Sequence, residues 1–109
     1  GHIKADELLK RLADVVKKQT RKSDIVARFG GEEFFILLPE TSLEKAKMLT
    51  SRLRDKIKSD KILKKYNLTV SGGLTEYKKG DTQKTIKERA DRALYDAKNS
   101  GRDRFVVVG

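Results

Sequence analysis

The sequence predicts an α/β domain in which helices pack against a mixed sheet that contains an antiparallel pair of strands. Gly30 and Gly31 separate two strand-like apolar runs, and glycine alone enters positive φ without steric cost, so this stretch predicts a tight β-hairpin. Segments with apolar residues at helical spacing alternate with the remaining strand-like runs. The predicted order is therefore helix, strand, strand, helix, strand, helix, strand.

The predicted elements follow from hydrophobic spacing and from turn residues. We expect helices over residues 6–19, 41–57 and 82–100, and strands over residues 25–29, 34–38, 68–74 and 105–108. The run 34–38 is apolar at every position, which is typical of a strand covered on both faces. Residues 58–65 are rich in lysine and predict a polar connection, and residues 76–81 predict a polar turn.

Local signals mark the ends and interiors of these elements. Thr41 and Glu44 have the spacing of a capping box, and the helix that they open is expected to bury Leu43. The glycine pair at 72–73 lies inside a predicted strand, which indicates a bulge or a close backbone approach. Gly101 stands where a helix C-terminal glycine belongs.

The bulk composition limits the class of protein and its partners. A chain of 109 residues forms at most one domain, and its net charge of +10 favours an anionic partner such as a nucleotide, a nucleic acid or an anionic membrane surface. The absence of cysteine excludes disulfides, cysteine-based zinc sites and thiol catalysis, and it fits a reducing cytoplasm. No apolar run approaches the length of a membrane span and no signal peptide is present, so we expect a cytoplasmic segment without membrane contact.

The residues at the predicted hairpin point to nucleotide chemistry. Glu32 and Glu33 follow the glycine pair directly. Two adjacent carboxylates repel each other, and nothing in a turn requires them, so their presence needs another explanation. A bare backbone that can approach a phosphate, beside two hard oxygen ligands for Mg²⁺, is what nucleotide chemistry uses. A solvated polar turn is the alternative that turn statistics favour for the glycine pair alone.

Strings of residues along the whole chain carry a resemblance to a known family. They are Arg21-x-x-Asp24, the run Arg28–Phe34 (Arg-Phe-Gly-Gly-Glu-Glu-Phe), Ser71-x-Gly73, and Ala93-Leu94-Tyr95-x-Ala97-Lys98-x-x-Gly101-Arg102. With them the chain resembles the GGDEF family of diguanylate cyclases, of whose signature Gly-Gly-Glu-Glu-Phe is a variant. The opening Gly-His-x-x-Ala-Asp is also similar to a family segment, with Ala5 in place of a glycine. The resemblance implies one GGDEF domain over residues 1–109, with the palm-like, ferredoxin-like fold of nucleotide cyclases.

The resemblance implies a diguanylate cyclase, which condenses two GTP molecules into cyclic di-GMP with release of pyrophosphate. Such enzymes use Mg²⁺ or Mn²⁺ and a homodimer in which two domains face each other, and an upstream sensory or receiver domain is implied as well. Glu32 and Glu33 would divide metal coordination and activation of the ribose 3′-hydroxyl between them, and which residue does which stays open.

The same resemblance assigns substrate-binding residues. They are Asp6 for the guanine edge, Gly30 and Gly31 for the close passage of the GTP phosphates, and Lys98 and Arg102 for the outer phosphates. For Asp6 the alternative is a helix cap or a dipole partner, and for Lys98 and Arg102 it is a complement to the helix dipole.

Arg21 and Asp24 have a separate meaning in this family. The resemblance implies that they form the site at which the product cyclic di-GMP inhibits the enzyme, with Arg52 as the secondary arginine. An arginine fork takes a phosphate or the guanine edge, and the carboxylate accepts from guanine. A solvated helix end with a surface ion pair is the alternative.

The family's domain starts with a strand that carries a metal-binding Asp, followed by a helix, and the resemblance places the start of this chain after both. We therefore expect the strands at 34–38 and 68–74 to have unpaired backbone and exposed apolar faces. The sheet could close over the gap, another chain could lend a strand, or the chain could belong to a longer protein. We also expect the 109-residue chain to self-associate or to be only marginally stable.

Two other functions compete with the cyclase. A non-catalytic module that binds cyclic di-GMP or GTP would work through Arg21, Asp24 and Arg52. The intact Gly30–Phe34 signature argues against such a module, because binding at the Arg21 site would not need Glu32 and Glu33. A nucleic-acid binder rests only on the charge and would need exposed aromatic residues for base stacking. The few aromatic residues fall mostly in core-like positions, so we expect no nucleic-acid partner.

Overall fold

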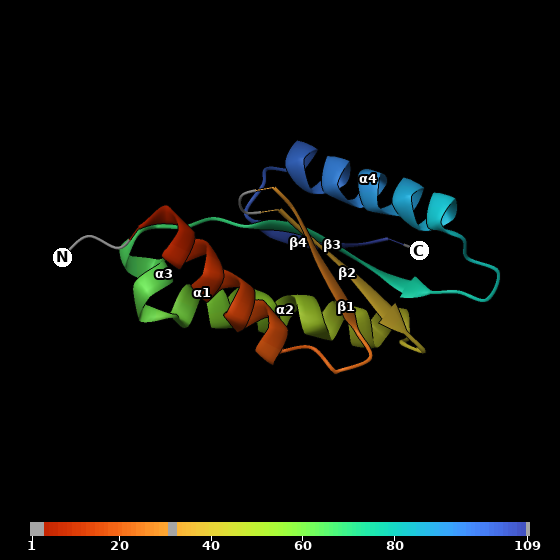
Figure 1. The fold of residues 1–109 in the computed structure, drawn as a ribbon, viewed down its shortest axis with the longest axis horizontal. Coiled ribbons are helices and arrows are strands. Elements are labelled where there is room, and N and C mark those ends of the chain that lie inside the picture. Colours follow the sequence, from red (N-terminus) through yellow and green to blue (C-terminus); the bar gives the residue numbers. More distant parts are fainter. Residues whose placement is uncertain (1–3, 31–32, 109) are drawn as a thin grey trace.

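The structure is a computed structural model, and it describes residues 4–30 and 33–108. Its elements in chain order are α1 (Ala5–Lys18), β1 (Ile25–Gly30), β2 (Glu33–Pro39), α2 (Leu43–Ser59), α3 (Lys61–Lys65), β3 (Ser71–Tyr77), α4 (Gln83–Asn99) and β4 (Arg104–Val108). Helices α1, α2 and α3 lie on one face of the sheet and α4 lies on the other, so the sheet is the middle layer (Figure 1). The predicted α/β class, with helices packed on a mixed sheet, is confirmed.

The described strands form one sheet in the order β1-β2-β3-β4. β1 and β2 are the antiparallel hairpin, and parallel ladders join β2 to β3 and β3 to β4. The expectation that β2 and β3 keep unpaired backbone is wrong, because they pair directly from Glu33 opposite Ser71 to Pro39 opposite Tyr77. Unpaired backbone groups inside a core are costly, and this direct pairing satisfies them. In the structure the sheet closes by this pairing, and whether the chain belongs to a longer protein is a separate prediction.

Strand β2 contributes to the cores on both faces of the sheet, because successive side chains of a strand point to opposite sides. Phe34, Ile36 and Leu38 pack with residues of α1 and α2, whereas Phe35 and Leu37 pack against α4. All five side chains are buried, which confirms the prediction of a strand covered on both faces.

The two glycines of β3 leave room on opposite faces of the sheet: Gly73 for Ala93 of α4, and Gly72 for the ring of Phe105 on the neighbouring strand β4. A Cβ added at Gly73 would lie 2.2 Å from the Cβ of Ala93, and one at Gly72 would lie 2.5 Å from the ring of Phe105. The parallel ladders continue without a register shift through both glycines. The glycine pair therefore serves a close approach of packed groups and not a bulge.

The start of α2 differs from the predicted capping box. Ser42, not Thr41, is the N-cap, and its hydroxyl accepts a hydrogen bond from the amide of Lys45 at 3.2 Å. Leu43 is 55% exposed, so its predicted burial is wrong. Leu43 continues the spacing of the buried stripe, but spacing does not reveal where the partner layer ends.

The predicted polar connection at 58–65 contains the short helix α3 instead. Asp60 caps it by accepting from the amides of Ile62 and Leu63, and the Leu63 side chain is buried. Strand β3 begins at Ser71 and not at residue 68, and it extends to Tyr77, where a turn was expected. The pairing with β2 decides where β3 begins and ends, and the local sequence does not show these boundaries.

The other elements match their predictions to within about two residues, the usual disagreement at element ends. Thr82 is the N-cap of α4 and forms a capping box with Thr85. Gly101 follows the helix with φ of 116°, which confirms it as the C-terminal glycine. No helix in the described part of the chain is long and apolar enough to cross a membrane.

Candidate active site

The end of the β1–β2 hairpin carries the predicted catalytic residues, and the structure describes part of it. Gly30 pairs with Glu33 across the hairpin, after a register shift between Arg28 and Gly30. The predicted site residues Gly31 and Glu32 lie outside the described residues. The geometry of the candidate site therefore rests on Glu33 and its neighbours.

Glu33 and Lys98, far apart in sequence, form an ion pair. The Lys98 Nζ lies 2.6 Å from the Glu33 Oε2, and the two side chains are 40% and 26% exposed. Lys98 is in the last turn of α4, and α4 packs across the sheet so that this turn reaches the start of β2. The Glu33 Oε2 is itself buried and has no hydrogen bond within the described residues. This oxygen is thus a buried anionic acceptor whose one described partner is a flexible cation.

Arg102 lies just beyond the same end of α4. Its amide donates to the carbonyl of Ala97 at 3.0 Å, and the amide of Gly101 donates to the carbonyl of Lys98 at 3.4 Å. These two bonds form a Schellman motif, in which glycine takes the left-handed position. The Arg102 side chain is exposed, so it is available to an incoming anion.

Asp6 belongs to a different element, helix α1. It is exposed in the first turn of α1, beside Glu7, where a carboxylate is favourable to the helix dipole. Helix α1 covers the face of the sheet opposite α4 (Figure 1). Within the described residues, no hydrogen bond or ion pair joins Asp6 to Glu33 or Lys98, and the role of Asp6 at a guanine edge stays a prediction.

Glu33 offers one carboxylate to a divalent cation at the hairpin. Magnesium is commonly bound through one or two carboxylates together with substrate phosphates. Within residues 4–30 and 33–108 no three acidic, His or Cys side chains form a metal-binding group. Glu33, with its buried and otherwise unbonded oxygen, suits the role of one carboxylate ligand.

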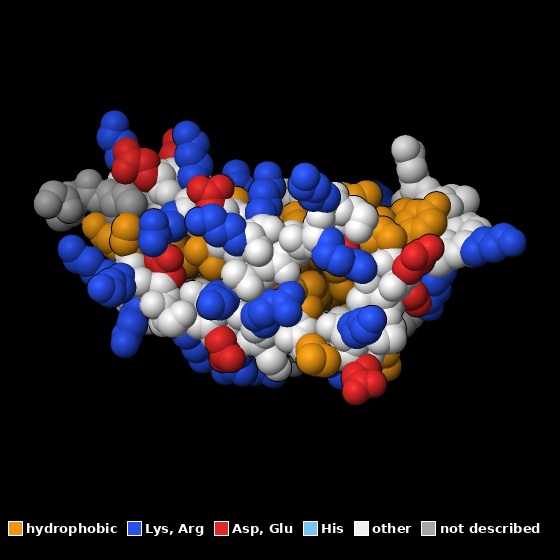
Figure 2. Space-filling model, turned by 90° about the horizontal axis from the view of Figure 1, so that it is seen from below, with side chains coloured by type: hydrophobic (Ala, Val, Ile, Leu, Met, Phe, Trp, Pro, Cys, Tyr) orange, Lys and Arg blue, Asp and Glu red, His pale blue; other side chains and the backbone are white. Residues whose placement is uncertain are grey.

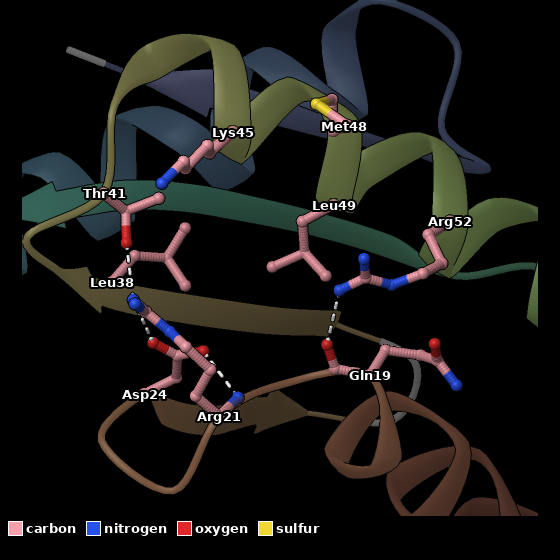
Figure 3. A pocket seen from close by; sticks show the side chains of 9 residues that line it. All are labelled: Gln19, Arg21, Asp24, Leu38, Thr41, Lys45, Met48, Leu49 and Arg52. Carbon is pink, nitrogen blue, oxygen red and sulfur yellow. Dashed lines mark hydrogen bonds and ion pairs between the residues drawn. The ribbon is translucent and has the colours of Figure 1, made fainter.

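A separate cavity of about 270 Å³ gathers the residues predicted for the inhibitory site (Figure 3). Arg21 and Asp24 lie in the loop between α1 and β1, and Arg52 is on α2. The other lining residues are Gln19, Leu38, Thr41, Lys45, Met48 and Leu49. The sequence prediction that Arg21, Asp24 and Arg52 belong to one place agrees with this arrangement.

Arg21 is fixed at the edge of the cavity by hydrogen bonds within the chain. Its Nη2 donates to Asp24 Oδ1 at 3.0 Å, to the Pro39 carbonyl at 2.8 Å and to Thr41 Oγ1 at 2.6 Å. Asp24 Oδ2 accepts from the Arg21 amide at 2.8 Å, and the Asp24 side chain is only 3% exposed. The pair is therefore part of a larger hydrogen-bond network, in which the Asp24 side chain is buried and the Arg21 side chain stays 56% exposed.

The opposite side of the cavity is formed by α2. The Arg52 Nη2 donates to the Gln19 carbonyl at 2.8 Å. Leu38 and Leu49 lie between the two arginines and provide an apolar floor (Figure 3). Cations around an apolar floor are suited to a planar ring that carries a phosphate.

Lys45 is a cavity residue that the sequence analysis missed. It stands seven residues before Arg52, and Leu49 lies between them, four residues after Lys45. Residues at these spacings share one face of a helix, so the helical period could have drawn attention to Lys45 once Arg52 was chosen.

Two ion pairs away from these sites stabilise the fold. Asp60 accepts from the Arg11 guanidinium at 2.9 Å, and this contact holds the pKa of Asp60 below its ordinary value. The Arg89 guanidinium, aided by the Lys78 amide, holds the pKa of Asp81 far below its ordinary value. Neither pair includes a residue of the two candidate sites, so we assign both pairs to stability.

Basic side chains dominate the face formed by α1 and α2. In the view from that side, Lys and Arg are spread along the whole length of the molecule, with fewer acidic groups among them (Figure 2). The exposed aromatic residues of the described chain are Tyr77, which ends β3, and Tyr95 on α4. The charge favours an anionic ligand, and Tyr95 lies on α4, across the sheet from this basic face (Figure 1).

Comparison with known proteins identifies the family. A family model described as "Diguanylate cyclase, GGDEF domain" matches residues 1–104. This chain belongs to the GGDEF family. The mixed sheet with helices on both faces is consistent with the GGDEF nucleotide cyclase fold.

Relatives of this GGDEF chain carry cyclase names. It is 44% identical to diguanylate cyclase DgcP of Pseudomonas aeruginosa over 99% of its length. It is 40% identical to diguanylate cyclase A of Treponema denticola over 98% of its length, and 40% identical to diguanylate cyclase DgcM of Escherichia coli over 99% of its length. The GGDEF chain spans 16%, 30% and 26% of these three proteins.

Proposed function

We propose that this GGDEF domain, over residues 1–109, is the catalytic part of a diguanylate cyclase. The reaction joins two GTP molecules: each ribose 3′-hydroxyl attacks the α-phosphate of the other, and two pyrophosphates leave. The observation that carries the proposal is the ion pair between Glu33 and Lys98, because it sets a buried carboxylate oxygen and a lysine ammonium at the glycine hairpin of the family signature. Family membership and the names of the relatives support the same reaction.

In the proposed mechanism, residues at the end of α4 bind the triphosphate. Lys98 exchanges its contact with Glu33 for a phosphate oxygen, which frees the Glu33 carboxylate. Arg102, exposed beside the helix end, holds a second phosphate oxygen with its planar fork. Gly30 and Gly31 leave room for the phosphates because they carry no side chain.

Glu33 and Glu32 would hold Mg²⁺ or Mn²⁺, which would supply charge neutralisation on the phosphates. One of the two glutamates would take the proton from the ribose 3′-hydroxyl. Asp6, which is exposed, would accept from the N1–H and N2–H donors of guanine. Because each domain holds one GTP, the condensation needs two domains face to face, and we propose a homodimer.

We further propose that Arg21, Asp24 and Arg52 bind cyclic di-GMP and inhibit the reaction. Support comes from the shared cavity of about 270 Å³, from its apolar floor and from its cations. The chain is also 34% identical to the response regulator PleD of Caulobacter vibrioides, of which it spans 25%. Because this relative is named a response regulator, we propose an upstream regulatory domain in the whole protein. We also propose that the protein acts in the cytoplasm.

The test compares matched variants of the whole protein that carries this domain, incubated with GTP and Mg²⁺ and analysed by liquid chromatography and mass spectrometry. The wild type should accumulate cyclic di-GMP and pyrophosphate with time. Glu33→Gln should slow this about 100-fold, the scale of losing one charge-stabilising group. Glu88→Gln, an exposed position of α4, is the control and should match the wild type. Equal rates for Glu33→Gln and the wild type would contradict the proposal.

The second candidate is a non-catalytic module that binds cyclic di-GMP or GTP. The internal hydrogen bonds of Arg21 favour it, because they preorganise a cavity that needs no catalytic group. A wild type without turnover, but with one cyclic di-GMP or GTP bound per cavity and lost on Arg21→Ala, would support this module over the cyclase.

A further inference from the structure

The turn between α4 and β4 holds a run of unusual backbone conformations. Gly101, Arg102 and Asp103 have φ of 116°, 58° and 47°. The Schellman motif at the end of α4 accounts for Gly101 alone, since it requires one left-handed residue. Arg102 and Asp103 carry a Cβ, which disfavours this region, although Asp enters it more readily than Arg. The end of the helix does not explain why these two residues also have left-handed backbone conformations.

The side chain of Arg104 braces this turn. Its Nε donates to the Arg102 carbonyl at 3.1 Å. Its guanidinium lies over Gly101, where a Cβ would meet the Arg104 Nη2 at 2.9 Å. The backbone of Arg104 is anchored in the sheet, opposite Ser71 of β3. Arg104 thus ties the strained turn to the rigid sheet.

The conformation of this turn decides the direction in which Arg102 leaves the end of α4. Lys98, one turn earlier in the helix, is held at Glu33. The proposed phosphate contacts need Arg102 and Lys98 to reach the same triphosphate, and a rotation of the Arg102 backbone would carry its side chain away. Strained residues persist at functional sites where the surroundings hold them.

We propose that Arg104 is a positioning residue for the phosphate clamp. It holds the left-handed turn through the Arg102 carbonyl, so that Arg102 is directed to the outer phosphates of GTP before the nucleotide binds. This inference rests on the proposed function, which places Arg102 on those phosphates.

The test measures GTP and GMP binding by calorimetry with the whole protein, because GMP lacks the outer phosphates. Arg104→Ala should weaken GTP binding about tenfold, the scale of losing one hydrogen bond to a charged group, and leave GMP binding unchanged. Arg104→Lys keeps the charge but has neither Nε nor a planar fork, so it should show the same loss. Arg92→Ala, an exposed arginine of α4 with only a 3.9 Å contact to Asp96, is the control for lost charge and should bind both nucleotides normally.

A double-mutant cycle separates positioning from a merely structural role. In an Arg102→Ala background, Arg104→Ala should cause no further loss of GTP affinity, because Arg104 acts through Arg102. Equal losses of GTP and GMP affinity, full recovery in Arg104→Lys, or an undiminished effect of Arg104→Ala in the Arg102→Ala background would each overturn the inference. If Arg102→Ala weakens GTP binding and Arg104→Ala does not, this inference alone fails. If Arg102→Ala has no effect, the proposed phosphate contact fails and the inference fails with it.

Discussion

Arg21 is held by the chain's own carbonyl and hydroxyl groups before any ligand is present. Its guanidinium reaches Pro39 and Thr41 at the end of β2, the strand whose other end begins at Glu33. A preformed fork loses little freedom when it binds an anion, which favours affinity.

We predict that Arg21→Ala abolishes binding of cyclic di-GMP to the chain, because the fork facing the cavity is lost. Calorimetric titration with cyclic di-GMP measures this. Lys22→Ala, the neighbouring exposed cation, removes the same charge outside the cavity and should bind normally. Undiminished binding by Arg21→Ala would remove the residue from the proposed site.

The pKa of Asp81 is lowered strongly by the groups around its carboxylate. Its carboxylate accepts from Arg89 at 2.7 Å and from the Lys78 amide at 2.8 Å, and its side chain is only 6% exposed. These donors hold the pKa of Asp81 well below the ordinary value. Because the folded value lies below the unfolded value of about 3.9, the stabilisation is complete above pH of about 4 and is lost as the pH falls further.

We therefore predict that Asp81→Asn lowers the free energy of unfolding at pH 7, and that its difference from the wild type shrinks below pH of about 4. Urea denaturation at several pH values measures this. Asp96→Asn is the control, since Asp96 is 44% exposed and 3.9 Å from Arg92. A difference that stays constant down to pH 3 would show that the Asp81 carboxylate does not carry the effect.

At the scale of elements, the packing of α4 on β3 depends on a missing side chain. Gly73 faces Ala93, and the distance of 2.2 Å from an added Cβ leaves no room for a methyl group. The contact between Gly73 and Ala93 helps to position α4, whose last turn carries Lys98. The spacing between α4 and β3 therefore affects the candidate active site as well as stability.

We predict that Gly73→Ala lowers the free energy of unfolding by about 1–3 kcal/mol through overpacking. The same change in an Ala93→Gly background should cost clearly less, because the clashing methyl group is gone. Urea denaturation of the four proteins of this cycle measures the coupling. Additive effects of the two changes would show that the close approach does not limit the packing.

At the scale of the whole molecule, the direct pairing of β2 with β3 joins both layers of helices to one sheet. The core on the α1–α2 side includes Leu53, which is fully buried, whereas Leu43 at the start of the same helix is 55% exposed. A small domain has a total stability of about 5–15 kcal/mol, so one core side chain is a large share of it.

We predict that Leu53→Ala lowers the free energy of unfolding by about 2–5 kcal/mol, because it leaves a cavity. Leu43→Ala should change it by less than about 0.5 kcal/mol, although both leucines continue the same helical spacing. Urea denaturation measures both. Similar losses of unfolding free energy for the two variants would mean that the first turn of α2 is covered in solution.

Sedimentation of the wild-type chain would test the separate expectation that the chain self-associates.

The candidate site was predictable where function depends on local strings of residues. The signature at Gly30–Phe34 and the string around Lys98 identified the phosphate-binding candidates from the sequence. The contact between Glu33 and Lys98 was not predictable, because it depends on how α4 crosses the sheet. The same holds for Lys45, which faces the cavity only because α2 packs beside the loop that carries Arg21.

The sequence by itself determined the long helices, the hairpin and the buried strand β2, because each depends on periodicity or on turn residues within a short window. The tertiary structure decided the pairing of β2 with β3, the start of β3 at Ser71, the short helix α3 and the exposure of Leu43. These features depend on contacts between distant segments. A local pattern shows which face of an element is apolar, and only the packed chain shows what covers it.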